Sequence, residues 1–153
     1  MKTILMAASA LLSTAAPAST WYFASSGGEA PERFERWIEA DSIQRDGSSA
    51  RFRVQEIREQ PDDRGVDRLM VIFQADCTTK TYRIVEFTGY LQSGANFTSP
   101  GRSGEHQAPP PDSVMDETIE IACGRHTPEL TSADPEAITR AGWRTRSRAD
   151  SVL

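Results

Sequence analysis

The side chains able to carry out chemistry are few in this 153-residue chain. It has two cysteines, Cys77 and Cys123, and two histidines, His106 and His126. The spacing Cys-x-x-His from Cys123 to His126 suits zinc, but a cysteine in a disulfide cannot bind a metal ion. A reactive cysteine needs a neighbour that lowers its pKa, and the sequence shows none. We therefore expect no metal site and no nucleophilic cysteine.

The acidic residues give no stronger signal for catalysis. Asp62, Asp63 and Asp67 lie close together, but their spacing differs from that of known calcium loops, and a solvated turn is the commoner outcome. A mechanism with two carboxylates at Glu117 and Glu120 would need a partner across a cleft. The chain also lacks a G-x-S-x-G elbow, a phosphate loop and a dinucleotide fingerprint. The sequence predicts a protein that is not an enzyme and has no cofactor.

Residues 1–18 have the pattern of a secretory signal. Lys2 supplies the positive charge, Ile4 to Leu12 the apolar stretch, and Ala16-Pro17-Ala18 the small-residue cleavage site. We therefore expect export to the periplasm or the cell surface of a Gram-negative-type bacterium.

In an oxidising compartment two cysteines form a disulfide by default. Here the disulfide would close a long loop and add about 4 kcal/mol to the free energy of unfolding.

The net charge of the chain is −5, from 17 Lys and Arg against 22 Asp and Glu. An acidic protein is a poor partner for nucleic acid or for an anionic membrane surface, since both select basic patches. Beyond the signal, no apolar run is long enough for a transmembrane helix.

The strongest structural signal is a pair of strands within Leu69–Leu91. Both arms alternate and are rich in β-branched and aromatic residues, and the four residues 77–80 join them as an antiparallel hairpin. Further strands are expected at Arg33–Ile43 and Ala50–Ile57. The Asp46-Gly47 pair between them is a hairpin signal.

The second half of the chain reads less clearly. Gln92–Pro111 is rich in Gly, Ser and Pro and predicts a long loop. A single helical turn is expected at Asp112–Glu117, with Ser113 as N-cap, followed by a final strand over Thr118–Cys123. Residues 125–153 predict a polar tail, partly disordered or helical, whose removal would change the melting temperature little.

Four aromatic residues are candidates for binding a partner. Trp21, Tyr22 and Phe23 begin the mature chain, and Phe97 lies in the long loop together with Arg102. Exposed aromatic residues near arginine are frequent energetic anchors of protein interfaces. The alternative is that the first three pack across the sheet as an edge strand or a docked terminus.

The order of these features resembles the bacterial surface-adhesin protein E family over residues 19–124. The resemblance rests on an ordered set of short motifs: Trp21, Trp37 to Ile43, Asp76-Cys77, Tyr82 and Tyr90, Asp112-Ser113, and Ala122-Cys123. It implies a compact α+β domain braced by a Cys77–Cys123 disulfide and a location in the envelope or at the surface. For the namesake of the family it also implies adhesion to host extracellular-matrix and serum proteins.

The sequence thus predicts one small α+β domain, mainly antiparallel sheet with one or two short helices, stapled by one disulfide. The expected function is that of a non-enzymatic, adhesin-like module that binds a host extracellular protein or an envelope component. The alternative is a periplasmic binder of a small ligand, or an accessory or inhibitor subunit. A small-ligand pocket lined by Trp37 and Phe52 would favour that alternative.

Overall fold

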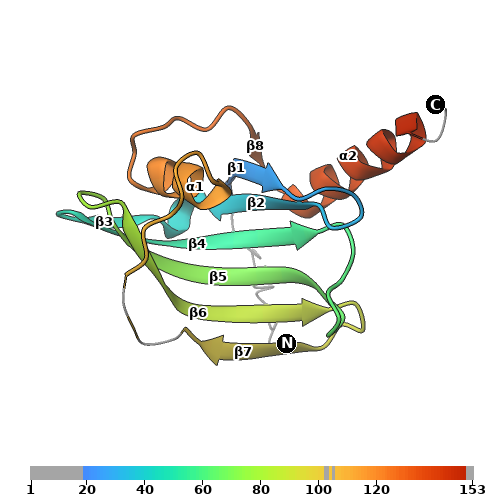
Figure 1. Ribbon diagram of the computed structural model, residues 1–153, viewed down its shortest axis with the longest axis horizontal. Coiled ribbons are helices and arrows are strands. Elements are labelled where there is room, and N and C mark those ends of the chain that lie inside the picture. Colours follow the sequence, from blue (N-terminus) through green and yellow to red (C-terminus); the bar gives the residue numbers. More distant parts are fainter. Residues whose placement is uncertain (1–18, 102–103, 105, 151–153) are drawn as a thin grey trace, which may run out of the picture.

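The structure is a computed structural model that describes residues 19–101, 104 and 106–150. The predicted signal and Arg102 lie outside the described residues. In the described part, a single antiparallel sheet has the order β7-β6-β5-β4-β2-β1-β8, with β3 paired to β4 (Figure 1). The strands are β1 Trp21–Gly27, β2 Phe34–Glu39, β3 Gln44–Asp46, β4 Ser49–Arg58, β5 Val66–Asp76, β6 Thr81–Leu91, β7 Asn96–Pro100 and β8 Thr131–Ser132. The helices are α1 Val114–Ala122, α2 Pro135–Asp150 and a 3-10 turn, η1, at Ala40–Ser42.

The predicted central hairpin is confirmed by β5 and β6, which pair from Asp76 opposite Thr81 to Val66 opposite Leu91. The turn between β3 and β4 is also confirmed: Gly47 has a φ of +56°, which glycine adopts without steric cost. The predicted strand at Arg33–Ile43 is shorter than expected, because the chain leaves β2 at Glu39 and enters η1. The fold class is therefore the one that the sequence predicts.

Each face of the sheet carries its own core. Trp37 and Ile38 are neighbours in β2, so their side chains point to opposite faces, and both are fully buried. Ile38 packs with Phe52 and with apolar residues of α1 on one face. Trp37 packs with Trp143 of α2 on the other. The sheet is thus the middle layer between two helices.

The prediction of a strand at Thr118–Cys123 is wrong, since this segment is the second half of α1. Four of its five buried residues, Met115, Thr118, Ile119 and Ala122, follow the spacing of one helical face, and the short alternation from Thr118 to Ala122 concealed that period. The N-cap prediction is confirmed, because the Ser113 hydroxyl oxygen accepts a hydrogen bond from the backbone N–H of Asp116.

The long predicted loop Gln92–Pro111 is also interrupted by structure. A tight turn, in which the N–H of Leu91 donates to the carbonyl of Ala95 at 2.9 Å, leads into β7. This strand has no buried residue and therefore no alternation that a sequence pattern can reveal. Phe97 of β7 lies over Gly89, where an added Cβ would come within 2.7 Å of the Phe97 ring.

The segment predicted as a polar tail, partly disordered or helical, contains α2, and the first half of this helix docks on the sheet. Trp143 is 5% exposed and lies in the core with Trp21 and Trp37. The indole N–H of Trp37 donates to the hydroxyl of Thr139 at 3.0 Å, and that hydroxyl donates to the Glu35 carboxylate at 2.6 Å. A large aromatic side chain and a buried hydrogen-bond chain therefore dock this helix on the sheet.

We predict that Trp143→Ala lowers the free energy of unfolding by about 3–5 kcal/mol, the usual cost of removing a buried aromatic side chain. The matched control is Ile138→Ala on the same helix, which is 43% exposed and should cost less than about 0.5 kcal/mol. Urea denaturation of both variants measures the difference. Equal stabilities of the two variants would mean that α2 contributes little to the fold.

The Cys77–Cys123 disulfide joins the end of the central hairpin to the end of α1 across a sequence separation of 46 residues. We predict that the double substitution Cys77→Ser and Cys123→Ser lowers the free energy of unfolding by about 4 kcal/mol, because the unfolded chain then gains the freedom of an open loop. Urea denaturation of the oxidised protein and the variant measures this change. An oxidised protein no more stable than the variant would contradict it.

A cluster of charged side chains also holds α1 to the turn between β5 and β6. The Lys80 ammonium group lies 2.7 Å from the Asp116 carboxylate and 2.8 Å from that of Glu120, both on α1. Hydrogen bonds from Lys80 lower the pKa of Asp116 and of Glu120, and hydrogen bonds to these carboxylates raise the pKa of Lys80. All three groups are charged at neutral pH.

These pKa shifts predict a plateau in the contribution of Lys80 to stability. The part that depends on the two carboxylates is present above their ordinary pKa values, near 4, and is lost as the pH falls through their lowered values. The part that depends on Lys80 is present below its ordinary pKa, about 10.4, and is lost as the pH rises through the raised value. The difference in melting temperature between wild type and Lys80→Met should therefore be largest between these limits. Arg64→Met, at an exposed position of another turn, is the charge-matched control and should show no such plateau.

Candidate functional site

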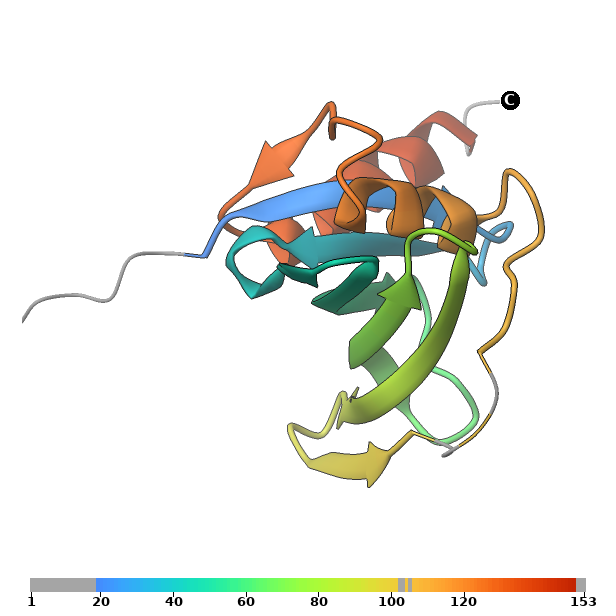
Figure 2. The same cartoon turned by 90° about the vertical axis from the view of Figure 1, so that its left-hand side faces the viewer.

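The face of the sheet that carries α1 is covered over only part of its width. The helix packs against β1, β2 and β4, and the sheet then curls away towards β7 (Figure 2). Two adjoining cavities lie on this face and share Ile84. We call them together the concave groove; its apolar floor consists of Phe34, Leu69, Val71, Phe73, Ile84 and Phe87.

The strand register explains why these residues share one face. Val71 lies opposite Phe87 and Phe73 lies opposite Ile84, with a bulge in β6 between the two pairs. The side chain of Ile84 is 39% exposed, although it belongs to a strand in the interior of the sheet. A large apolar side chain exposed in a hollow is the usual mark of a contact surface rather than of a core.

The end of the groove beside β7 depends on a close approach of two backbones. The N–H of Gly101 donates to the carbonyl of Val85 at 2.8 Å. A Cβ at position 101 would lie 1.9 Å from the Ile84 carbonyl oxygen, so glycine is required here. This part of the groove has a volume of about 530 Å³, and Tyr82, Ser99 and Gln107 complete its wall.

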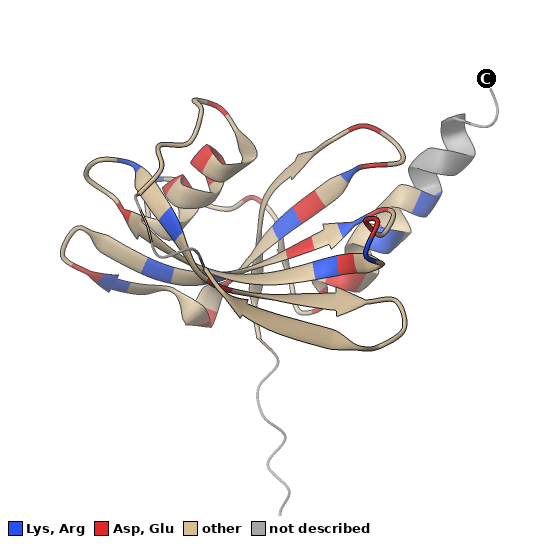
Figure 3. Cartoon of the chain, turned by 60° about the horizontal axis from the view of Figure 1, so that its bottom comes forward, with Lys and Arg blue, Asp and Glu red and all other residues tan. Residues whose placement is uncertain are grey.

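The other end of the groove has a volume of about 650 Å³ and a charged rim. Glu56 accepts hydrogen bonds from Arg36 at 2.9 Å and from Arg58 at 3.1 Å, and Arg58 also pairs with Asp62. Partial burial acts to raise the pKa of Asp62, but hydrogen bonds from two backbone N–H groups and the charge of Arg58 lower it overall. Acidic and basic residues thus alternate on neighbouring strands (Figure 3).

The structure separates the predicted binding residues. Trp21 is 9% exposed and belongs to the core beneath α2, and Phe23 packs edge-on against Trp37 with ring centroids 5.3 Å apart. Tyr22 points to the opposite face and packs against the core under α1. These three residues therefore pack across the sheet, which was the alternative interpretation of them.

Phe97 is the predicted residue that the structure places beside the groove. Its side chain is 37% exposed, and its ring centroid lies 6.2 Å from that of Phe87 on the groove floor. Ile84 and Phe87 were missed as site residues. Strict alternation places Ile84 and Phe87 on opposite faces, and only the bulge in β6 brings both to this face. No local pattern tells which half of a sheet face a helix will cover.

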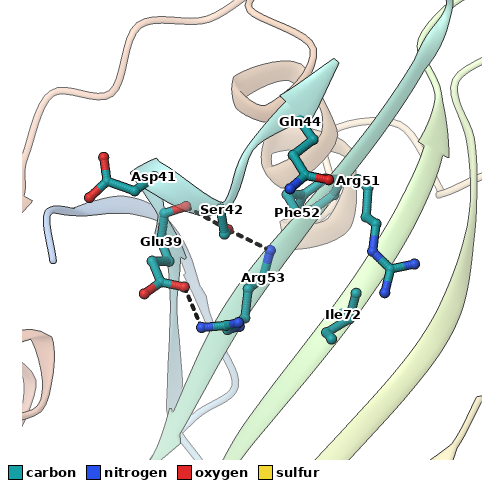
Figure 4. A pocket seen from close by; sticks show the side chains of 8 residues that line it. All are labelled: Glu39, Asp41, Ser42, Gln44, Arg51, Phe52, Arg53 and Ile72. Atoms are coloured by element: carbon teal, nitrogen blue, oxygen red, sulfur yellow. Dashed lines mark hydrogen bonds and ion pairs between the residues drawn. The ribbon is translucent and has the colours of Figure 1, made fainter. Parts of the chain in front are cut away.

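A second depression, of about 390 Å³, lies where η1 crosses β4 (Figure 4). Its polar groups bind one another: Arg53 pairs with Glu39 at 2.7 Å, and the Ser42 hydroxyl donates to the Glu39 carbonyl and accepts from the Arg53 backbone N–H. These bonds hold the corner at which the chain leaves β2. We interpret this depression as structural.

The cysteine, histidine and acidic side chains considered for chemistry do not come together in the described part of the chain. No group of three or more His, Cys, Asp or Glu side chains there could hold a metal ion. Asp67 pairs with Arg140 of α2 and Asp62 with Arg58, so the acidic cluster of the sequence is divided. His126 is exposed at a hollow next to α1.

No helix in the described residues is long and apolar enough to span a membrane.

Comparison with known proteins gives one family. The model of the family described as surface-adhesin protein E matches residues 24–124. Comparisons with curated proteins and with solved structures give no match. Because the match spans more than half of the chain, this protein belongs to the surface-adhesin protein E family.

Proposed function

We propose that this protein is an exported, non-enzymatic, adhesin-like module that binds a protein partner through the concave groove. Membership of a surface-adhesin family supports both export and binding. The observation that carries the proposal is the exposure of Ile84 inside an apolar hollow of the sheet. Phe97 extends the contact surface towards the sheet edge.

The groove has the composition of a protein interface. Its floor is aliphatic and aromatic, and its rim carries paired charges of both signs, as in the core and rim of protein contacts. The paired arginines and carboxylates already satisfy one another, so they favour a partner of matching shape without demanding a single charged ligand.

The alternative of a small-ligand binder has less support. The pocket expected for it would be lined by Trp37 and Phe52, but these side chains are 0% and 1% exposed and lie in two separate cores. The groove instead extends over residues of β2, β4, β5, β6 and β7. Such an extended surface suits a macromolecule better than a small molecule, which proteins usually enclose.

Photo-crosslinking tests the groove directly. A photoreactive phenylalanine analogue in place of Ile84 should crosslink the protein to a partner in the native cell envelope or in host extracellular extract. The matched control carries the analogue at Ile138, which is equally exposed but lies on α2. Adducts of the same mass at both positions, or none at position 84, would contradict the proposal.

Once the partner is identified, Ile84→Asp should weaken its binding at least about tenfold. A buried aliphatic side chain is worth about 1.5–3 kcal/mol, and the new carboxylate would also lose hydration in the interface. Ile138→Asp should leave the dissociation constant unchanged. Equal affinities of both variants by calorimetry would place the binding surface elsewhere.

The final location also belongs to this proposal. Protease treatment of intact cells that cleaves the protein would support surface display and a host partner. Protection until the outer membrane is opened would support a periplasmic partner instead.

A further inference from the structure

The outer edge of β7 carries hydrogen-bonding groups with no strand beside them in the described structure. β7 pairs with β6 on one side and ends the sheet on the other. The N–H of Gly101 and the carbonyl of Ala95 point inward to β6. Because the direction alternates along an antiparallel strand, residues 97 and 99 also point inward, and Asn96, Thr98 and Pro100 point outward.

This edge therefore offers a short and defined set of backbone groups. Asn96 and Thr98 each present one N–H and one carbonyl, and Pro100 presents a carbonyl alone. Another extended strand is the structure that satisfies such a row. The Pro100 ring and the length of five residues limit the pairing to one short segment, which protects the edge against open-ended association.

The side chains beside this edge define the pattern of the added strand. Phe97 and Ser99 lie on the groove face, next to Phe87 of β6, so residues of the added strand on that side would extend the apolar floor. On the opposite face the exposed Glu86 carboxylate lies across from Pro100 and forms no ion pair with the described residues. Charge complementarity there favours a lysine or arginine.

We propose that β7 accepts an added strand from the protein partner, an extended segment in which apolar residues alternate with polar ones that include a lysine or arginine. The inference rests on the proposed function and specifies how the partner is held beside the groove. A second copy of this chain fits the edge less well. Two-fold pairing about Thr98 would place Asn96 opposite Pro100 at both ends, so two carbonyls would lack an N–H partner, whereas a strand from another protein leaves one such carbonyl.

The substitution Thr98→Pro tests whether the outward backbone N–H of residue 98 binds the added strand. It removes an outward N–H, and proline is tolerated in an edge strand when that N–H faces solvent. It also removes the hydrogen bond between the hydroxyls of Thr98 and Thr88, which are 2.9 Å apart. Thr98→Val is the matched control, because it loses the same hydroxyl but keeps the N–H.

The probe is a random twelve-residue peptide library displayed on phage and selected on the purified exported protein. Enriched peptides should show the alternating apolar and basic pattern and bind Thr98→Val with unchanged affinity. Their affinity for Thr98→Pro should fall at least tenfold. In wild-type protein, amide hydrogen exchange of Asn96 and Thr98 should slow on addition of the selected peptide, a readout that does not depend on how well either variant folds.

Three outcomes would overturn the inference: no enriched peptide, equal binding to the proline and valine variants, or no protection of the two amides. Self-association of the wild-type protein that Thr98→Pro abolishes would assign the edge to a second copy and would also overturn it. If Ile84→Asp prevents partner binding and Thr98→Pro does not, the strand-addition proposal fails while the proposed function of the groove stands.

Discussion

The fold depends on the attachment of one short helix to the end of the central hairpin. α1 has nine residues, too few to form a stable helix alone in water, so its position has to come from tertiary contacts. A disulfide, a lysine between two carboxylates and the Arg45 side chain on the Ala122 carbonyl fix its ends to the hairpin turns. Its apolar face then covers β1, β2 and β4. The rest of the sheet face remains open because the helix is this short and is held at this end.

The open groove and the curl of the sheet are consequences of the same arrangement. The bulge in β6 and the glycine at position 101 bring β7 around, so that the uncovered half of the face becomes concave. A flat face would expose a wide apolar area to water, whereas a curled one exposes Ile84 and Phe97 as separate points. The protein can therefore keep a contact surface available without a large continuous apolar patch.

The sequence predicts the parts of this structure that local chemistry determines. The central hairpin, the Asp46-Gly47 turn and the Ser113 cap follow from short patterns, and the disulfide follows from the presence of two cysteines in a chain with the pattern of an exported protein. The segment Thr118–Ala122 was misread because five residues fit both a period of two and a helical face. The role of Trp143 was also missed, because a single apolar residue in a polar segment shows no periodicity. It packs against Trp21 and Trp37, which lie far from it in the sequence.

The candidate site was predictable only in part, for a physical reason. Phe97 was recognised as a surface aromatic residue, and it lies beside the groove. Ile84 and Phe87 have the same sequence signature as core residues such as Val71. Their exposure depends on the length and anchoring of α1 and on the curl of three strands, which are properties of the whole fold.

The hydrogen-bond chain from Trp37 through Thr139 to Glu35 connects an early strand with the last helix across more than 100 residues. β8, which also lies late in the chain, pairs with β1 at the opposite end of the sequence. The N-terminal strands therefore find their final partners only when the last segment has been delivered. A chain synthesised from its N-terminus therefore cannot complete the core around Trp37 until Trp143 of α2 has been added.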